Sequence, residues 1–243
     1  MKLIKTIHFL GYKLELFMDE TNNKLTHKSH DYLIKDNIKL NFGPGPNWKK
    51  PDDTWCCVDV NPMLGDIVLN FQSFETLPLQ ENSVICVYGS HVFEHISIFK
   101  SQIVFNEIYR VLKKNGIFRL VLPDVEKSIK EFLNRNDEYK LFQRRKERAK
   151  ARYGLDYTLF QCLKEDFLSP SGQKHLFGEH TLAHQNAWDY ESIIKDLHVA
   201  GFQIENIKKM DFKISQSDYF SFEGTYPSEA NEDYRSLYVE AIK

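Results

Sequence analysis

Short apolar segments alternate with longer polar or amphipathic segments between residues 38 and 123. Five of them are rich in Val, Ile and Leu and have the length of single strands: IKLNF (38–42), WCCVDV (55–60), DIVLNF (66–71), VICVYGS (84–90) and IFRLVLP (117–123). Strands that are buried on both faces of a parallel sheet are near-continuous apolar runs, and the longer connections between them accommodate crossovers. The pattern therefore predicts βαβ units in a doubly wound α/β sheet.

Two amphipathic helices are predicted where apolar side chains recur every three or four positions. The first covers residues 98–113, and we expect Asn115 or Gly116 to supply its left-handed cap. The second covers YESIIKDLHVA (190–200) and is closed by Gly201. Helices with this spacing bury one face against a sheet.

The rest of the chain divides into an N-terminal extension, an insertion and two further strands. The extension covers residues 1–37, and the two strands are expected around residues 203–210 and 237–242. Residues 125–189 are charged, have a helical pattern with loops and contain the basic run KLFQRRKERAKAR (140–152). We therefore predict one domain over the whole chain, with a helical insertion after the fifth strand.

The composition is that of a globular protein without a general affinity for polyanions. The 243 residues are 42% hydrophobic and 27% charged, and the formal net charge is −2. This balance gives no overall attraction to nucleic acid or to an anionic membrane. No apolar run approaches the length of a membrane span, and the first residues lack the apolar core of an export signal. We expect a cytoplasmic protein that binds no nucleic acid and has no membrane span.

The four cysteines have the spacing of neither a metal site nor a redox pair. They form no CxxC pair and no cluster with histidines at metal-binding spacing. They are Cys56, Cys57, Cys86 and Cys162. We expect buried, reduced thiols and no resident metal ion.

The sequence NFGPG (41–45) ends the first predicted strand, at the edge where doubly wound sheets bind their ligands. Asp59 closes the next strand, 18 residues after Asn41, where a carboxylate can accept hydrogen bonds from both ribose hydroxyls. The loop lacks the third glycine of a dinucleotide fingerprint, and the chain has no GxxxxGK[ST] sequence. Because a pyrophosphate would be poorly held here, an adenosine that carries an amino acid fits better.

In their order and spacing these segments resemble the class I S-adenosylmethionine-dependent methyltransferases, specifically the type 11 group often found near surface-polysaccharide genes. Six motifs carry the resemblance: KLNFGPG, WCCVDVNP, DIVLNFQSFETLPLQENSV, YGSHVFEHI, EIYRVLKKNGIFRLVLPD, and DYESIIKDLHVAGF with SLYVEAIK. The resemblance implies a seven-stranded, mostly parallel sheet whose last strand is antiparallel. It also implies S-adenosylmethionine as the cofactor and methyl transfer to an O, N or C nucleophile.

The resemblance further implies cofactor contacts from ten residues: Asn41, Gly43, Pro44, Gly45, Asp59, Val60, Asn70, Phe71, Ser90 and His91. The glycine loop would hold the methionine part, and Asp59 would bind the ribose. Two residues depart from the family pattern. Pro44 replaces a small residue or cysteine between the glycines, and Asn70 stands where the family often has an acid. These departures leave open a non-catalytic partner subunit with an eroded cofactor site.

Three residues are catalytic candidates: His91, Asp124 and His180. His91 follows the strand that would end near the transferable methyl, and a histidine with a pKa of about 6.5 can take a hydroxyl proton during attack. Asp124 follows the fifth strand, and its alternative role is to cap a helix. His180 and His184 would share a helical face, but two ligands without a third do not make a metal site.

The resemblance, rather than any sugar-recognising residue, favours O-methylation of a sugar or glycan precursor in surface-polysaccharide biosynthesis. The insertion 125–189 is expected to cap this small-molecule acceptor. The basic run 140–152 is either a solvated helix face or a site for an anionic acceptor, such as a nucleotide-linked or phosphorylated sugar. N-methylation of a small metabolite and aminopropyl transfer are the alternatives. The sequence leaves the oligomeric state open.

Overall fold

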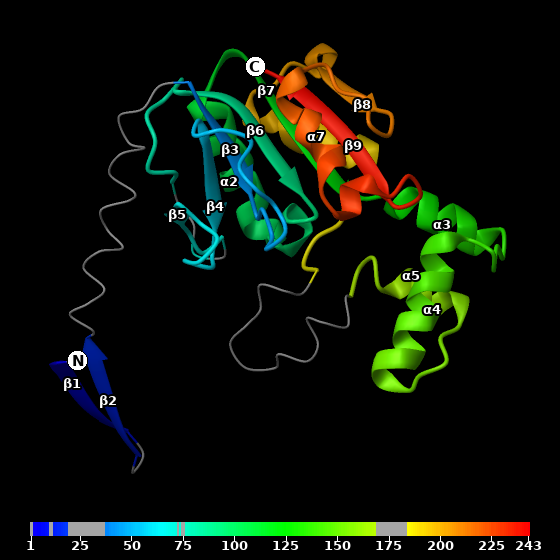
Figure 1. Cartoon of the computed structure of the whole chain (residues 1–243), viewed down its shortest axis with the longest axis horizontal. Coiled ribbons are helices and arrows are strands. Elements are labelled where there is room, and N and C mark those ends of the chain that lie inside the picture. The colour runs from blue at the N-terminus through cyan, green and yellow to red at the C-terminus, as the bar shows by residue number, and fades with distance from the viewer. Residues whose placement is uncertain (1, 10–11, 19–36, 72, 74–75, 169–183) are drawn as a thin grey trace.

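The computed structural model describes residues 2–9, 12–18, 37–71, 73, 76–168 and 184–243, and a seven-stranded sheet lies at its centre (Figure 1). In chain order the strands are β3 (Ile38–Phe42), β4 (Trp55–Asp59), β5 (Ile67–Val68), β6 (Val84–Ser90), β7 (Leu112–Pro123), β8 (Ile207–Met210) and β9 (Ser236–Ile242). They lie in the order β5-β4-β3-β6-β7-β9-β8. Strand β9 is antiparallel to both neighbours, and the other pairs are parallel. The predicted seven-stranded, mostly parallel fold with an antiparallel last strand is confirmed.

Both predicted amphipathic helices pack on the same face of the sheet. They are α2 (Ile98–Val111) and α7 (Tyr190–Ala200), and they also contact each other. Phe105 of α2 and Leu197 of α7 are fully buried in one apolar core with side chains of the strands. Gly201, at a φ of 120°, ends α7 as predicted, because this backbone conformation suits a residue without a side chain.

Three element boundaries differ from those predicted. Helix α2 ends at Val111, because Leu112 already has extended backbone angles and begins β7. Asn115 has a φ of 65° but lies within β7 and does not cap the helix. The edge strand β5 has two residues instead of six. The short 3-10 helix η4 (Ile204–Asn206) precedes β8, so this strand starts later than expected.

The second face of the sheet lacks the crossover helices that βαβ units would place there. The connections from β3 to β4 and from β4 to β5, residues 43–54 and 60–66, are fully described and contain no helix. The C-terminal segment 211–235, which includes the 3-10 helix η5 (Asp218–Thr225), supplies apolar side chains to this face instead. The chain between β8 and β9 therefore forms one layer of the fold.

Aromatic side chains build this second layer. Phe222 of η5 packs edge-on against Trp55 and Tyr88, with ring centroids 5.0 Å and 5.2 Å away. Trp48, from the loop after β3, contacts both Trp55 and Phe222. Aromatic pairs with this geometry contribute about 0.5–1.5 kcal/mol each beyond their burial. The packing holds η5 over the middle of the sheet.

A fully buried arginine, Arg119 of β7, binds the same segment by charge. Its Nη2 lies 2.6 Å from Oε2 of Glu223 in η5, and its Nη1 lies 2.7 Å from Oε1 of Glu240. Glu240 is the register partner of Arg119 on β9, so two charged side chains face each other inside the sheet. Arg119 and Glu240 are 0% exposed and Glu223 is 5% exposed. Charges at this depth persist only when paired.

The predicted insertion after the fifth strand is helical. Helices α3 (Val125–Leu133), α4 (Lys140–Tyr153) and α5 (Leu159–Lys164) follow β7 and form a lobe beside the sheet (Figure 1). The lobe has a small core of its own that includes Phe142 and Cys162. Residues 169–183 of the predicted insertion lie outside the described residues.

The described part of the N-terminal extension is a hairpin. Strands β1 (Lys2–Phe9) and β2 (Tyr12–Met18) pair in antiparallel fashion with each other. Within the described residues, none of the helices combines the length and apolarity needed to cross a bilayer. All four cysteines are buried and free, as the sequence predicted.

Breaking the buried charge cluster should destabilise the protein strongly. Arg119→Met leaves two buried carboxylates without a cation, so we expect the free energy of unfolding to fall by about 3–5 kcal/mol in urea titrations. Combining it with Glu223→Gln and Glu240→Gln should restore part of this loss. Lys195→Met, which removes an exposed partner of Glu191 on α7, is the control and should change little. A loss below about 1 kcal/mol for Arg119→Met would contradict this role.

Candidate functional site

A cavity of about 230 Å³ opens at the carboxyl ends of β3 and β6. The loop 43–47 after β3 and the residues Ser90 and His91 form one side of it. The opposite side is residues 226–229, which continue the C-terminal layer beyond η5. In open α/β sheets this edge is where ligands bind. The cavity therefore lies where the sequence places the cofactor.

Asn41, the fourth residue of β3, lines this cavity and is 1% exposed. Within the described residues, neither Nδ2 nor Oδ1 of its amide has a hydrogen-bond partner. Leaving a buried polar group unpaired costs about 1–3 kcal/mol. The amide offers a donor and an acceptor, which match the carboxylate and the ammonium group of an amino acid. Among the described residues, the Asn41 amide therefore has a free donor and a free acceptor directed at a buried part of the cavity wall.

Two glycines, Gly43 and Gly45, shape the loop that lines the cavity after β3. Gly43 has a φ of 58°, and a Cβ atom at this position would lie 2.5 Å from Cγ2 of Val92. Gly45 has a φ of 68°, and a Cβ atom there would meet no other atom within 4 Å. Gly43 is therefore required by the packing of the loop, whereas Gly45 is required by its backbone angle and leaves open space beside the cavity.

Six of the ten predicted cofactor residues line the cavity: Asn41, Gly43, Pro44, Gly45, Ser90 and His91. The other four lie outside it, near the carboxyl ends of β4 and β5: Asp59, Val60, Asn70 and Phe71. Asp59 is 8% exposed, its carboxylate accepts a hydrogen bond from the Asn61 N–H at 2.7 Å, and burial raises its pKa. The ring of Phe71 stacks on Phe42. The predicted set thus divides into a cavity part and a part along the sheet edge.

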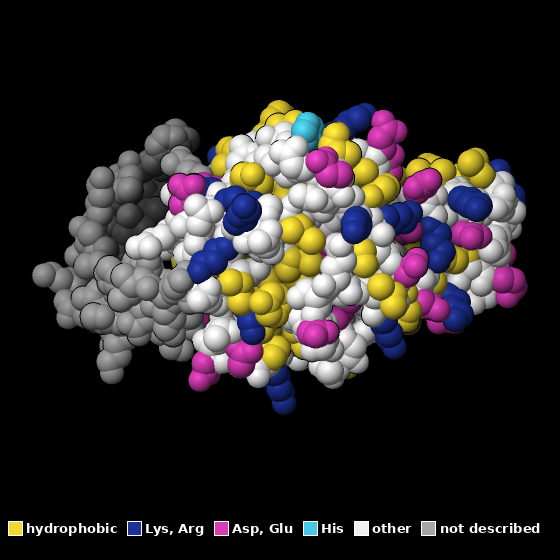
Figure 2. Space-filling model, turned by 90° about the horizontal axis from the view of Figure 1, so that it is seen from above, with side chains coloured by type: hydrophobic (Ala, Val, Ile, Leu, Met, Phe, Trp, Pro, Cys, Tyr) yellow, Lys and Arg dark blue, Asp and Glu magenta, His cyan; other side chains and the backbone are white. Residues whose placement is uncertain are grey.

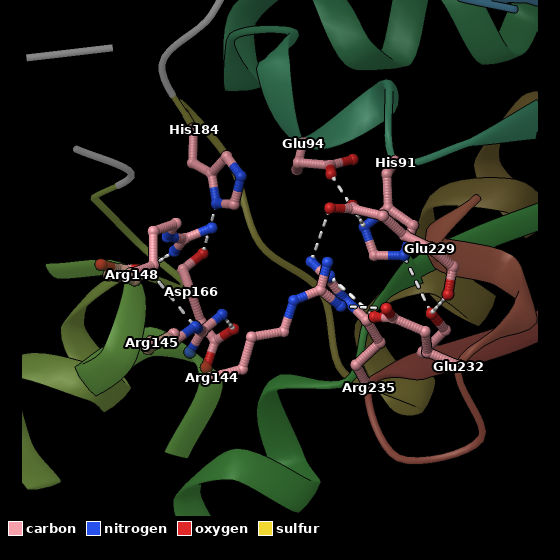
Figure 3. Close-up of polar contacts among 12 residues, drawn as sticks. His91, Glu94, Arg144, Arg145, Arg148, Asp166, His184, Glu229, Glu232 and Arg235 are labelled. Carbon is pink, nitrogen blue, oxygen red and sulfur yellow. Dashed lines mark hydrogen bonds and ion pairs between the residues drawn. The ribbon is translucent and has the colours of Figure 1, made fainter. Parts of the chain in front are cut away.

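His91, which lines the cavity, lies between two carboxylates (Figure 3). Its Nδ1 lies 2.9 Å from Oε2 of Glu229 and 3.4 Å from Oε1 of Glu94. Its Nε2 lies 2.9 Å from Oγ of Ser236. The backbone of His91 has a φ of 50°, a conformation that non-glycine residues adopt rarely.

The hydrogen bonds around His91 indicate an imidazolium. The hydroxyl of Ser236 donates to the backbone oxygen of Glu229, so it accepts a proton from Nε2 of His91, while Nδ1 donates to the Glu229 carboxylate. Burial opposes the charged ring, but Glu229 and Glu94 outweigh it and raise the pKa of His91 to about 9. The expectation of a histidine with an ordinary pKa is therefore wrong, because the sequence could not show these two neighbours.

Glu229 is the main site residue that sequence reasoning missed. It lies in the 3-10 helix η6 (Glu229–Asn231), its side chain is 45% exposed, and it borders the cavity. Arg235 contacts its carboxylate at 2.9 Å. Burial favours the neutral form, but His91 and Arg235 hold the pKa of Glu229 well below its usual range. No sequence pattern or motif links Glu229 to His91, which lies far away along the chain.

Asp124, the second catalytic candidate, is not among the residues that line the cavity. Asp124 is the N-cap of α3, and its Oδ1 accepts a hydrogen bond from the Lys127 N–H at 2.9 Å, which is the alternative role that the sequence left open. His180 lies outside the described residues. His184 is described, and its Nδ1 makes a 2.8 Å hydrogen bond with the backbone oxygen of Asp166.

The basic run is largely neutralised within the chain. Five of its side chains pair with carboxylates: Arg144 with Glu232, Arg145 with Asp166, Lys146 with Asp137, Arg148 with Glu165 and Lys150 with Asp156. Arg145 is buried at 5% exposure. Basic and acidic side chains are interspersed over this lobe on the face that Figure 2 shows. These five cations have acidic partners within the chain, and the pair of Arg144 with Glu232 joins the lobe to the segment before β9.

The His91–Glu229 pair should make stability depend on pH. The folded pKa of His91 is raised above its unfolded value, so its contribution is complete below about pH 6.5 and is lost as the pH rises through about 9. The difference in unfolding free energy between the parent and His91→Gln should therefore shrink by about 3 kcal/mol from about pH 6 to about pH 10. Urea titrations of both proteins measure it. A difference that stays constant with pH would contradict the imidazolium assignment.

Residues 59–120 match the sequence profile of a family described as a methyltransferase domain, of type 11. The matched segment runs from the end of β4 through β6 into β7, and so includes Ser90 and His91 of the cavity. No curated protein matches the chain.

The fold is also similar to those of solved methyltransferase structures. A chain of the complex between the Haloferax volcanii Trm112 methyltransferase activator and a methyltransferase shares 13% identity at a TM-score of 0.46, over 89% of this chain and 86% of that one. A Methanosarcina mazei S-adenosylmethionine-dependent methyltransferase shares 14% identity at a TM-score of 0.46, over 88% and 95%. Phosphoethanolamine N-methyltransferase 2 of Haemonchus contortus, solved with S-adenosylmethionine, shares 14% identity at a TM-score of 0.41, over 91% and 52%.

The family match and the order of the sheet are independent observations. The family match covers the end of β6 and His91, which border the cavity. The sheet is seven-stranded and mostly parallel, as the resemblance to class I methyltransferases predicted. Residues 59–120 are accordingly similar to a methyltransferase domain, and the described sheet has the strand arrangement that the resemblance predicted.

Proposed function

We propose that the chain transfers the methyl group of S-adenosylmethionine to a hydroxyl group of a polar, sugar-like acceptor, with the cavity beside Asn41 as the place of transfer. The observation that carries the proposal is the buried, unpaired amide of Asn41 in a cavity that His91 and Glu229 also line. The amide suits the amino-acid end of the cofactor. The charged pair suits the proton that a hydroxyl must lose.

The residues present fit the cofactor in two parts. Asn41 and the loop around Gly43 would hold the methionine end, and the carboxylate of Asp59 would accept hydrogen bonds from the ribose. The cavity of about 230 Å³ is smaller than most ligand pockets, which suits a site that encloses one end of a ligand. Asn70 and Phe71 would border the adenine at the end of β5. The bound cofactor would supply an electrophilic methyl group on a sulfonium.

We assign the proton transfer to Glu229 and a positioning role to His91. An alcohol that attacks a methyl group becomes a strongly acidic oxonium, so a carboxylate with a low pKa is a sufficient acceptor for its proton. Glu229 is ionised, partly exposed and at the cavity wall. His91 has both ring nitrogens engaged, so it holds the carboxylate in place rather than taking the proton itself. Much of the rate would come from alignment of the acceptor.

The acceptor would approach between the cavity and the helical lobe, which we propose as its cap. The polar residues that line the cavity include Asn47, Ser90, His91 and Glu229, a set that suits a polyhydroxylated molecule. A glycan precursor of surface-polysaccharide biosynthesis is the acceptor class we propose. With the lobe cations paired internally, a neutral sugar fits better than a strongly anionic one.

An amine acceptor is the second candidate, because Glu94 and Glu229 bring two carboxylates to one end of the cavity. The ammonium group of such an acceptor would be attracted to these two carboxylates, which pair with the imidazolium of His91 in this structure. The two acceptors are separated by assaying methyl transfer to matched hydroxyl and amino sugars. Preference for the amino sugar would replace O-methylation by N-methylation.

Removing the unpaired amide should weaken the cofactor without harming the fold. Asn41→Leu should lower the affinity for S-adenosylhomocysteine by about 30-fold, or about 2 kcal/mol, because hydrogen bonds to charged groups are lost. Its thermal stability should stay equal or rise, since a buried unpaired polar group is removed. Asp59→Ala should weaken binding by about 2–4 kcal/mol through the ribose.

Calorimetric titration measures these affinities, and Asp53→Ala, at an exposed position outside the site, is the control. No binding by the parent would favour the eroded-site alternative that Pro44 and Asn70 suggest. Binding that Asn41→Leu and Asp59→Ala leave unchanged would move the cofactor site elsewhere.

The proton-transfer assignment makes a pH prediction. Glu229→Gln should reduce kcat by about 100-fold or more at unchanged cofactor affinity, because general-base catalysis is worth about that much. The kcat of the parent should fall as the pH rises through about 9, when His91 loses its proton and no longer holds Glu229. A neutral His91 acting as the base would give the opposite limb, with kcat rising up to about pH 9. A kcat that rises with pH in this way would show that His91, rather than Glu229, is the general base.

A further inference from the structure

Three side chains with metal-binding groups converge next to the cavity. They are Glu94 and His95 of the 3-10 helix η2 (Phe93–His95) and His184 of the segment before α7. One potential ligand atom of each lies within 4.8 Å of the other two. The two imidazole rings are 5.0 Å apart between centroids and meet edge to face. Two histidines and a carboxylate are a common ligand set for divalent transition metals.

Backbone hydrogen bonds hold the two segments of this cluster together. The backbone oxygen of Glu94 accepts from the N–H groups of Gln185 and Asn186 at 2.8 Å and 3.1 Å. The side chain of Gln185 also donates to the backbone oxygen of His95 at 3.1 Å. His184 directly precedes these anchored residues, so its position near η2 is fixed by the main chain. The cluster is therefore a built arrangement rather than a chance approach of long side chains.

The ring of His184 is oriented for coordination. Its Nδ1 makes a 2.8 Å hydrogen bond with the backbone oxygen of Asp166, which requires the proton on Nδ1 (Figure 3). The other ring nitrogen, Nε2, then carries the lone pair in the neutral ring. Metal-binding histidines typically donate from one ring nitrogen to a carbonyl or carboxylate in this way, which fixes the ring and its tautomer.

Glu94 supplies an unsatisfied oxygen. The residue is 1% exposed, and within the described part of the chain its Oε2 has no hydrogen-bond partner. Its Oε1 faces His91 at 3.4 Å and His95 at 3.9 Å, while the shorter contact of His91 is with Glu229. A buried carboxylate oxygen without a donor is costly, and a cation would remove that cost.

We propose that Glu94, His95 and His184 form a binding site for a divalent transition-metal ion, with zinc as the best fit. Zinc accepts two imidazoles and a carboxylate, at metal–ligand distances of about 2.0–2.2 Å, and leaves a fourth position open in catalytic sites. Ligand atoms within 4.8 Å of one another need side-chain movements of about 1 Å to reach that geometry. The site needs no bound cofactor, and Glu94 places it beside the His91–Glu229 pair.

The test is a titration of the full chain, purified with chelator, with Zn²⁺ and with Co²⁺. We expect saturable binding of one ion per chain, and for Co²⁺ a visible absorption of a low-coordinate N/O site without the near-ultraviolet band of thiolate ligands. His184→Ala and Glu94→Gln should each weaken binding by about 100-fold or more, since changes to mere supporting groups already cost 10–100-fold. His198→Ala, whose ring also contacts a backbone oxygen, is the matched control and should bind like the parent.

Absence of saturable binding by the parent would overturn the proposal, as would equal binding by His184→Ala and the parent. A thiolate band would assign the ion to the cysteines instead and would also overturn it. The same His184→Ala protein should bind S-adenosylhomocysteine like the parent. Metal binding without cofactor binding by the parent would therefore refute the proposed function and leave the metal site standing.

Discussion

The ion cluster of Arg119 with Glu223 and Glu240 is the interaction on which the rest of the structure depends. The first connections of the sheet carry no crossover helices in the described residues, so one face must be covered by the chain between β8 and β9. Aromatic side chains contribute to the burial on that face, and the ion cluster adds a directional contact. The guanidinium fixes η5 to a single register on β7 and β9, and so places residues 226–229 over the glycine loop.

The sequence predicted the sheet because that information is local. Apolar runs reveal buried strands, and Gly201 marks a helix end, whichever partner each element finds. The sequence also contains evidence for the central ion cluster. Arg119 and Glu240 each interrupt an apolar strand, and a buried charge needs an opposite charge nearby, so an ion pair between these strands could have been predicted. The lack of a helix in the described connections 43–54 and 60–66 was not predictable from the alternating pattern, because loops of similar length satisfy it.

The candidate site also contains residues that local sequence information could place and residues that it could not. Asn41 and Ser90 follow strands whose carboxyl ends meet at one edge, so their place at the cavity follows from topology. Glu229 reaches His91 only through the C-terminal layer, and no local pattern encodes that return. The charge state of His91 was mispredicted for this reason, because it depends on Glu229 and Glu94 and not on the residues that flank it in the chain.

The central claim is that the C-terminal layer completes a cofactor site built on the glycine loop. A crystal structure of the chain with S-adenosylhomocysteine tests it most directly. We expect the amino-acid end of the ligand within hydrogen-bond distance of the Asn41 amide, the ribose hydroxyls at Asp59, and the sulfur facing Glu229. A ligand bound away from the carboxyl ends of β3 and β4, or one in the glycine loop with residues 226–229 displaced from it, would contradict the account.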